Sequence, residues 1–184
     1  IDKACRQIGG KQRARRRFVQ DGFRKRAGTT SGLQPVGAGG GAGRPAVGAR
    51  RGGEPETARA ILDAAGVKAR SAALDVRSSE SVARFVADVV ERRGGVDILV
   101  NAAGVYVEAP VEGHPDAAWD DQIDTNLSGT FRMIRAVMPH MTGAGWGRIV
   151  NLASVAAHQG MANNAAYCAS KAGLLGLGRC VSLE

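Results

Sequence analysis

From residue 71 onward, short apolar runs alternate with longer amphipathic stretches. The apolar runs are residues 71–76, 96–100 and 149–152. Apolar residues recur at three- and four-residue spacing over residues 81–93 and 115–141, and another helical pattern opens near Asn163. Because parallel strands need crossover connections that usually contain a helix, this alternation predicts an α/β fold with a doubly wound parallel sheet and helices on both faces.

For two predicted helices, the sequence indicates the first residue and an apolar face. The longer one begins at Pro115 and runs to about Met141. One stripe of it is apolar and is interpreted as facing the core: Trp119, Ile123, Leu127, Phe131, Ile134 and Met138. The other begins at Pro55, ends at Gly66, which suits a C-terminal cap, and has its own apolar face.

Three side chains suited to proton chemistry follow the last apolar run. Ser154 comes just after residues 149–152, and Tyr167 and Lys171 lie four positions apart in a helical pattern. Residues i and i+4 share one helix face, and open parallel sheets bind ligands at the carboxyl ends of their strands. We infer carbonyl reduction or its reverse, alcohol oxidation.

Proton transfer explains why these residue types occur together. A hydride that moves onto a carbonyl carbon leaves an alkoxide, which needs a proton from an acid about 3 Å away. Tyr167 would supply that proton, and the Lys171 charge would favour the resulting phenolate. Ser154 would hydrogen-bond the substrate oxygen and orient it against Tyr167.

The order of these residues resembles the catalytic signature of the classical short-chain dehydrogenase/reductase family. Ser154, Tyr167 thirteen positions later and Lys171 match its catalytic residues, and Asn126 in D-T-N-L-S-G-T-F matches the fourth. The resemblance implies an NAD(P)-dependent oxidoreductase with an incomplete Rossmann-like fold. It also implies that Asn126 holds a water linking Lys171 to solvent.

The same resemblance implies which residues bind the cofactor. N-A-A-G, Asn101 to Gly104, is similar to the family's N-N-A-G beside the cofactor, with Ala102 in place of the second Asn. Asp75 in L-D-V stands where the family's third strand contacts the adenine, and Tyr167 and Lys171 hold the nicotinamide ribose. An Arg at the end of the second strand favours NADP over NAD, and Arg50 and Arg51 lie near that position. The expected cofactor is NADP or NAD, with a preference for NADP.

The resemblance further implies a small ketone or alcohol substrate and a homo-oligomer, in which the long helix and the catalytic helix pack across a subunit interface. Tyr106, in the loop after Gly104, could border the substrate pocket. The family's last strands and substrate-closing loop would lie beyond Glu184, so we expect this chain to be a fragment. The resemblance covers its residues 56–184. The substrate itself cannot be read from these residues.

Residues 1–55 differ from the rest of the chain. They hold 13 Lys or Arg against 3 Asp or Glu, whereas residues 56–184 hold 12 against 14. They show neither helical nor strand periodicity, so they are interpreted as a basic Gly/Arg-rich leader. The family's phosphate-binding T-G-x-x-x-G-x-G belongs near residue 28, but A-G-T-T-S-G-L-Q matches it only at two glycines, and G-A-G-G-G-A-G from Gly37 lies too late.

Two explanations of the leader stay open: out-of-frame translation of GC-rich DNA, or a genuine basic extension. Two other functions stay open as well. The chain could be a cofactor-binding or interaction module without catalysis, or the basic arm could bind nucleic acid through phosphates. The slightly acidic body does not favour nucleic acid as its partner.

Other residues exclude several classes of protein. The three histidines lack metal-ligand spacing, so no metal site is expected. The odd number of cysteines, three without a C-x-x-C motif, fits a reducing cytoplasm. No stretch has the roughly 18 apolar residues that a membrane span requires.

Overall fold

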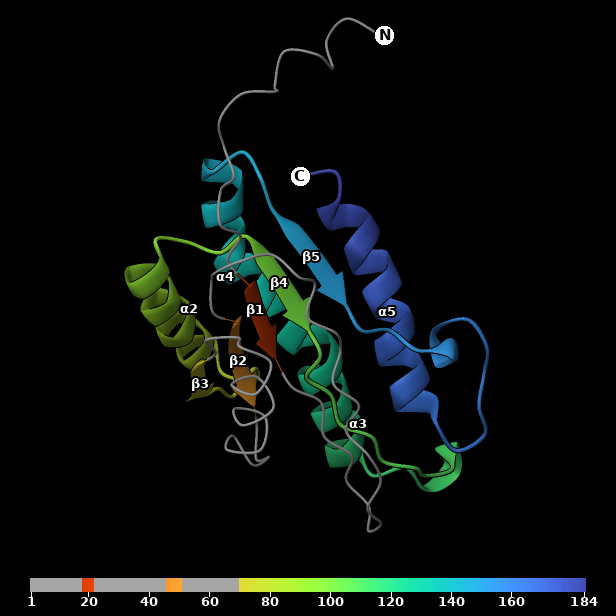
Figure 1. Cartoon of the computed structure of the whole chain (residues 1–184). Helices are drawn as coiled ribbons and strands as arrows, with labels where there is room; N and C mark the ends of the chain where they lie inside the picture. The colour runs from red at the N-terminus through yellow and green to blue at the C-terminus, as the bar shows by residue number, and fades with distance from the viewer. Residues whose placement is uncertain (1–17, 22–45, 51–69) are drawn as a thin grey trace, which may run out of the picture.

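The computed structural model describes residues 18–21, 46–50 and 70–184, and among these it contains a five-stranded parallel sheet (Figure 1). The strands are β1 (Phe18–Asp21), β2 (Ala46–Arg50), β3 (Arg70–Ala73), β4 (Ile98–Asn101) and β5 (Arg148–Asn151). Their order across the sheet is β3-β2-β1-β4-β5. Strands leave β1 in one direction up to β3 and in the other direction from β4, so the switch point of the sheet lies between β1 and β4. The predicted doubly wound parallel sheet is confirmed.

Two of these strands lie where the sequence showed no strand pattern. β1 and β2 fall within residues 1–55, and that part of the prediction was wrong. The strands are only 4 and 5 residues long, too short for a clear period of two. Each is held by backbone pairing on both sides, β1 between β2 and β4 and β2 between β1 and β3, which does not depend on a particular side-chain pattern.

Other predictions for the first part of the chain fall outside the described residues. They are the helix from Pro55 to Gly66 and both candidate glycine motifs. The division of the chain at residues 55 and 56 therefore stays a prediction.

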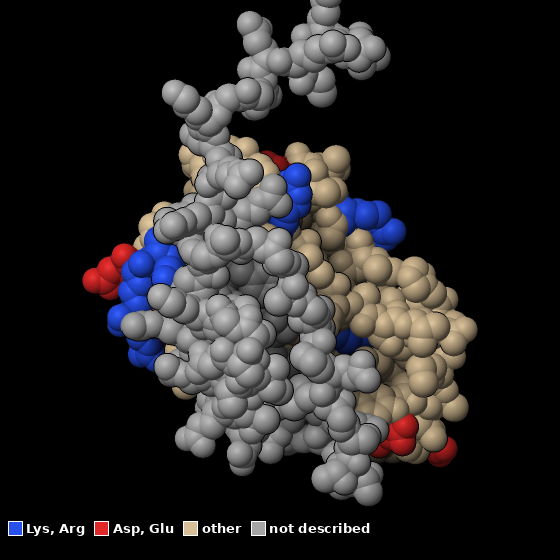
Figure 2. Space-filling view, viewed as in Figure 1, with Lys and Arg blue, Asp and Glu red and all other residues tan. Residues whose placement is uncertain are grey.

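The helix α2 (Ser79–Arg93) agrees with the predicted helix over residues 81–93. Ser78 caps its first turn by accepting a hydrogen bond from the Ser81 N–H, and Gly94 ends it with a left-handed φ of 76°. The inner face buries Val82, Phe85, Val86 and Val89. Figure 2 shows basic and acidic side chains together over α2, as expected for the solvent face of an amphipathic helix.

The predicted long helix is one helical run with three parts. α3 (Asp116–Ile123) continues into a π-helical turn, η2 (Asp124–Ser128), and then into α4 (Gly129–Gly143). Pro115 is the N-cap, as the sequence predicts. The π turn contains Asn126 and so lies at the predicted site, where such turns are frequent in proteins.

The π turn also changes which side chains face inward. Trp119 and Phe131 were interpreted as core residues, but they are 39% and 45% exposed. The buried face of the first half is instead polar and includes Gln122, Thr125 and Asn126. A π turn holds more residues than an α turn, so a stripe counted at ideal α spacing drifts away from the true inner face.

Helix α5 (Ala165–Val181) completes the described elements, together with the short 3-10 turns η1 (Val111–Gly113) and η3 (Val155–Ala157). α4 packs on both β4 and α2, and α3 packs on α5. Figure 1 shows α4 behind the sheet, with α2 to one side and α5 to the other. The apolar core lies in this layer and includes Leu99, Met133 and Val137, all 0% exposed.

At the edge of the described sheet, β5 alternates exposed and half-buried residues, and Val150 is 48% exposed. None of the helices in the described ranges is long and apolar enough to cross a membrane.

The helical run lies close to Val76 at Gly129, the first residue of α4. A Cβ built there would lie 2.7 Å from Val76 Cγ2 and 3.0 Å from Val76 Cβ. Gly129→Ala should therefore lower the free energy of unfolding by about 1–3 kcal/mol, the usual cost of overpacking. Urea unfolding measures the change.

Gly143→Ala is the matched control at the other end of α4, because an added Cβ there meets no atom within 4 Å. It should leave stability unchanged or raise it by up to about 1 kcal/mol. Equal effects of the two substitutions would contradict close packing at Gly129.

Candidate active site at the carboxyl edge of the sheet

Several predicted site residues lie where parallel strands end, at one edge of the sheet. Asn101 is the last residue of β4, Asp75 lies two residues beyond β3, and Ser154 lies three residues beyond β5. Asn101 Nδ2 donates to Asn151 Oδ1 at 2.8 Å, which links the ends of β4 and β5. Asn151 was not singled out from the sequence; its place at the end of an apolar run was the available signal.

Tyr167 and Lys171 lie on one face of α5, as their spacing predicts. Lys171 is only 3% exposed, and its Nζ donates to the Leu152 carbonyl at 2.7 Å. The same Nζ lies 5.7 Å from the centroid of the Tyr167 ring. A buried ammonium needs compensating contacts, and here a carbonyl dipole and an aromatic face provide them.

Ser154 is the N-cap of η3, which packs against α5. Its Oγ accepts a hydrogen bond from the Ala156 N–H at 3.2 Å, and a hydroxyl oxygen that accepts there still has its proton to donate. Both Ser154 and Tyr167 are half-buried. The packing of η3 on α5 therefore places the hydroxyl-bearing turn beside the helix that carries Tyr167, although no hydrogen bond joins Ser154 and Tyr167 in the described structure.

Asn126 has its side chain fully inside the protein, 0% exposed. Its Oδ1 accepts from the Val105 N–H at 2.7 Å, and its Nδ2 donates to the Val105 carbonyl at 3.0 Å and to Ser170 Oγ at 3.1 Å. Ser170 Oγ in turn donates to the Tyr167 carbonyl at 2.8 Å. Asn126 thus connects the loop after β4 to α5. Ser170 was missed because a Ser in a helix carries no signal of its own.

Tyr106 reaches the catalytic helix from that loop. Its ring meets the Tyr167 ring edge-on, with centroids 5.0 Å apart and planes at 82°, a favoured aromatic geometry. Its hydroxyl donates to Glu108 Oε1. Burial, followed by the hydrogen bond to Glu108 and the charge of that residue, raises the pKa of the Tyr106 phenol, so it stays neutral near pH 7.

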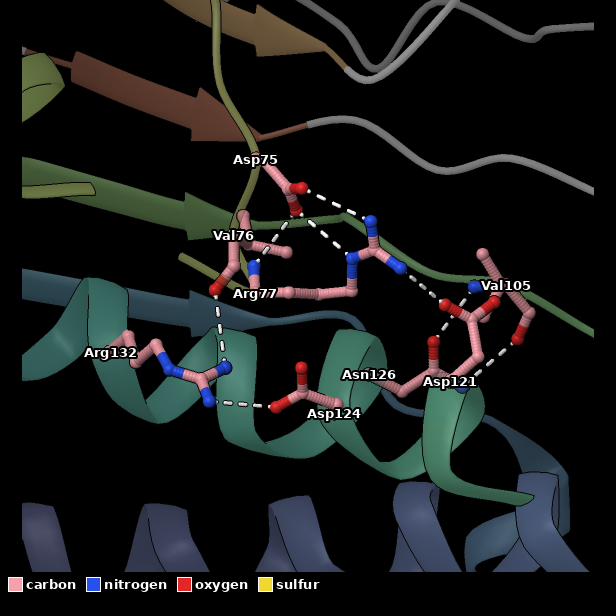
Figure 3. Close-up of polar contacts among 8 residues, drawn as sticks. All are labelled: Asp75, Val76, Arg77, Val105, Asp121, Asp124, Asn126 and Arg132. Carbon is pink, nitrogen blue, oxygen red and sulfur yellow. Dashed lines mark hydrogen bonds and ion pairs between the residues drawn. The ribbon is translucent and has the colours of Figure 1, made fainter. Parts of the chain in front are cut away.

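Two arginines brace the segment after β3 against the helical run (Figure 3). Arg77 donates to both carboxylate oxygens of Asp75, through Nε and Nη2 at 3.1 Å each, and through Nη1 to Asp121 of α3 at 2.8 Å. These contacts, first among them the hydrogen bonds to Asp75, raise the pKa of the Arg77 guanidinium. Arg132 of α4 bonds the Val76 carbonyl at 3.4 Å and Asp124 at 2.7 Å.

An open groove of about 940 Å³ borders this network. Arg77, Val107 and the outer side of α3 line it, with Asp120, Asp121 and Asp124 among the residues of its wall. The described residues hold no cluster of three or more His, Cys, Asp or Glu that could bind a metal.

The carboxyl edge has polar groups suited to a dinucleotide. Asn101 Oδ1 is buried and has no hydrogen-bond partner in the described structure, and a buried polar atom of this kind indicates a missing partner. Lys171 supplies a buried positive charge nearby, beyond the end of the neighbouring strand. Asp75 follows the third strand, Ala102 is 4% exposed, and Gly104 is also buried.

Together, the strand order, the polar residues at the carboxyl edge and the Tyr167–Lys171 pair form the arrangement expected of a dinucleotide-binding α/β domain. Residues 41–184 match the short chain dehydrogenase family, and the chain belongs to that family. Its enzymes are oxidoreductases that use NAD or NADP and act on small molecules.

The curated relatives that the chain resembles carry the names of different enzymes. The chain is 42% identical over 110 residues to D-beta-hydroxybutyrate dehydrogenase of Rhizobium meliloti, covering 60% of this chain and 43% of that protein. It is 44% identical over 115 residues to D-threitol dehydrogenase of Mycolicibacterium smegmatis, covering 62% and 44%. The chain spans about half the length of the curated relatives it matches.

Among solved structures, a variant of actinorhodin polyketide ketoreductase with NADPH superimposes with a TM-score of 0.72 at 40% identity. The match covers 75% of this chain and 54% of that one. The fold predicted from the sequence is therefore that of structures in the same family.

The bridge that Arg77 forms between Asp75 and Asp121, called here the Arg77 bridge, gives a prediction about stability. Arg77→Met removes the guanidinium hydrogen bonds to the carboxylates of Asp75 and Asp121. The free energy of unfolding should fall by about 1–2 kcal/mol, at the lower end for charged hydrogen bonds because the guanidinium is partly exposed. Urea unfolding at neutral pH measures it.

Arg84→Met is the control, since Arg84 pairs with Glu80 on the surface of α2 with both side chains over 70% exposed. Its loss should change stability by less than about 0.5 kcal/mol. If the two variants behave alike, the Arg77 bridge does not stabilise the fold.

Proposed function

We propose that the protein interconverts a ketone and a secondary alcohol by hydride transfer with an NAD(P) cofactor. The observation that carries this proposal is the placement of Tyr167 and the buried Lys171 on one helix face beside the carboxyl edge of the sheet. A phenol and an ammonium in contact at the place where this sheet type binds ligands are suited to donating and recovering one proton.

Each residue has a role in this mechanism. When bound, NAD(P)H would supply the hydride to the carbonyl carbon. Ser154 donates a hydrogen bond to the carbonyl oxygen and orients it, and Tyr167 gives its hydroxyl proton to that oxygen as the C–H bond forms. Lys171 stabilises the negative charge left on Tyr167, and Asn126 anchors the water through which Tyr167 regains a proton. Alcohol oxidation follows the same steps in reverse.

The cofactor groups extend along the strand ends. Asn101, Ala102 and Gly104 would border the nicotinamide half, where Lys171 also binds the ribose, and Asp75 would receive the adenine. NADP is favoured because Arg50 is the last residue of β2, the position from which an Arg accommodates the 2′-phosphate. The likeness to a ketoreductase solved with NADPH supports the same preference.

The protein is also proposed to form a homo-oligomer through α4 and α5. Phe131 of α4 is 45% exposed and carries the Arg135 guanidinium 5.2 Å from its ring centroid. A large apolar side chain held outside the core is better explained by a partner subunit than by packing within the chain.

Tyr167→Phe in the full-length protein tests the chemistry. Oxidation of D-β-hydroxybutyrate and D-threitol should fall at least about a thousandfold, because the variant loses the general base that takes the proton from the alcohol. NADPH binding, followed by its fluorescence, should be unchanged, and NADPH should bind more tightly than NADH. Turnover retained by the variant would overturn the role of Tyr167, and failure of the wild type to bind either cofactor would overturn the function.

Phe131→Asp tests the oligomer. A carboxylate at this position would lose its hydration in the proposed interface, so the variant should sediment as a monomer while keeping its helical circular dichroism. Arg84→Met, on a different helix, should keep the wild-type mass. A wild-type protein that is already monomeric at micromolar concentration would contradict the proposed interface.

A further inference from the structure

The loop after β4 is held by a ladder of hydrogen bonds from two buried side-chain amides. Asn126 pairs with the N–H and the carbonyl of Val105, and Gln122 pairs in the same way with Val107, at 3.1 Å and 3.3 Å. Gln122 is 0% exposed. A third bond joins the Ala109 N–H to the Asn163 carbonyl at 2.9 Å, next to the start of α5. Residues 105, 107 and 109 are thus fixed, and the alternation is that of an extended chain.

The spacing explains why one helix can hold an extended segment. Residues four apart on a helix are separated by about 6 Å along its axis, and residues two apart in an extended chain by about 6.6 Å. Gln122 and Asn126 therefore match Val107 and Val105 in antiparallel order. The helix here takes the place that a neighbouring strand would take in a sheet.

The ladder also decides where Tyr106 goes. Side chains alternate between the two faces of an extended segment, so Tyr106 and Glu108 share the face opposite Val105 and Val107. This agrees with the hydrogen bond between the Tyr106 hydroxyl and Glu108. On that face the Tyr106 ring meets Tyr167. If Val107 shifts, the ring that packs against the phenol shifts with it.

We propose that Gln122 is a positioning residue: by binding both backbone groups of Val107, it sets the Tyr106 ring against Tyr167 and so fixes the orientation of the phenol. Tyr106 then acts as a neutral aromatic wall of the substrate site. This inference rests on the proposed function, because its consequence is the geometry of proton transfer by Tyr167. Gln122 itself touches neither substrate nor cofactor.

The test is a double-mutant cycle in the full-length protein with Gln122→Met and Tyr106→Ala. Methionine has nearly the shape of glutamine but neither donates to the Val107 carbonyl nor accepts from its N–H. Each single variant should lower kcat for D-β-hydroxybutyrate or D-threitol oxidation by about tenfold, as expected when a reacting group is misplaced by a fraction of an ångström. The Kd for NADPH, measured by fluorescence, should stay within about twofold of wild type, since Gln122 binds Val107 and none of the residues proposed to border the cofactor.

The double variant decides between positioning and general destabilisation. If Gln122 acts through Tyr106, adding Gln122→Met to Tyr106→Ala should reduce kcat no further. A multiplied loss, about a hundredfold in total, would overturn the proposal. Thr125→Val is the control, because Thr125 is 3% exposed in the same helical run and its Oγ1 has no partner in the described structure. It should keep wild-type kcat.

Two further outcomes are distinct from these. If Gln122→Met does not fold, Tyr106→Ala alone decides, and wild-type kcat in that variant overturns the inference. If wild type binds NADPH but Tyr167→Phe keeps full turnover, the proposed chemistry is overturned, and the positioning role falls with it because it acts through Tyr167.

Discussion

The buried side chain of Asn126 is the interaction on which the rest of the site depends. One amide group bonds to the loop after β4 through Val105 and to α5 through Ser170. An amide that lost these partners would remain inside the protein without its three hydrogen bonds, at a cost of several kcal/mol. The loop, the π turn and the catalytic helix are therefore fixed relative to one another by polar contacts in a place where apolar packing would give no direction.

The helical run from α3 to α4 has a polar and an apolar half. Its first half buries polar side chains that bind backbone groups of the loop, and its second half buries Met133, Ile134 and Val137 against the core. The π turn lies at the junction, and the bonds of Arg132 to Val76 and Asp124 hold that junction from the side of β3. The apolar half stabilises the fold, whereas the polar half fixes the position of the loop after β4.

The sequence predicted what depends on regular spacing. The Tyr167 and Lys171 pair, the helix over residues 81–93 with its glycine cap, and the parallel sheet all follow from periods that can be counted. The sequence did not predict the contacts in which a side chain hydrogen-bonds to the backbone of a distant loop. Gln122 looks like a surface residue in a helix, and nothing local shows that it faces a loop 15 residues earlier in the chain. It failed also at β1 and β2, because short strands held on both sides need no alternating pattern. Trp119 and Phe131 were placed in the core because counting at α-helical spacing does not reveal the π turn.

The amide ladder has a consequence for how such a site can be redesigned. Because Val105 and Val107 must meet two amides whose separation is set by a helix, the length of the segment between them is fixed. Inserting or deleting one residue would move every later side chain to the opposite face, and Tyr106 would exchange places with a valine. New substrate preferences can therefore be introduced at this wall by exchanging the side chains at positions 106 and 108, whereas grafting loops of other lengths would dismantle it.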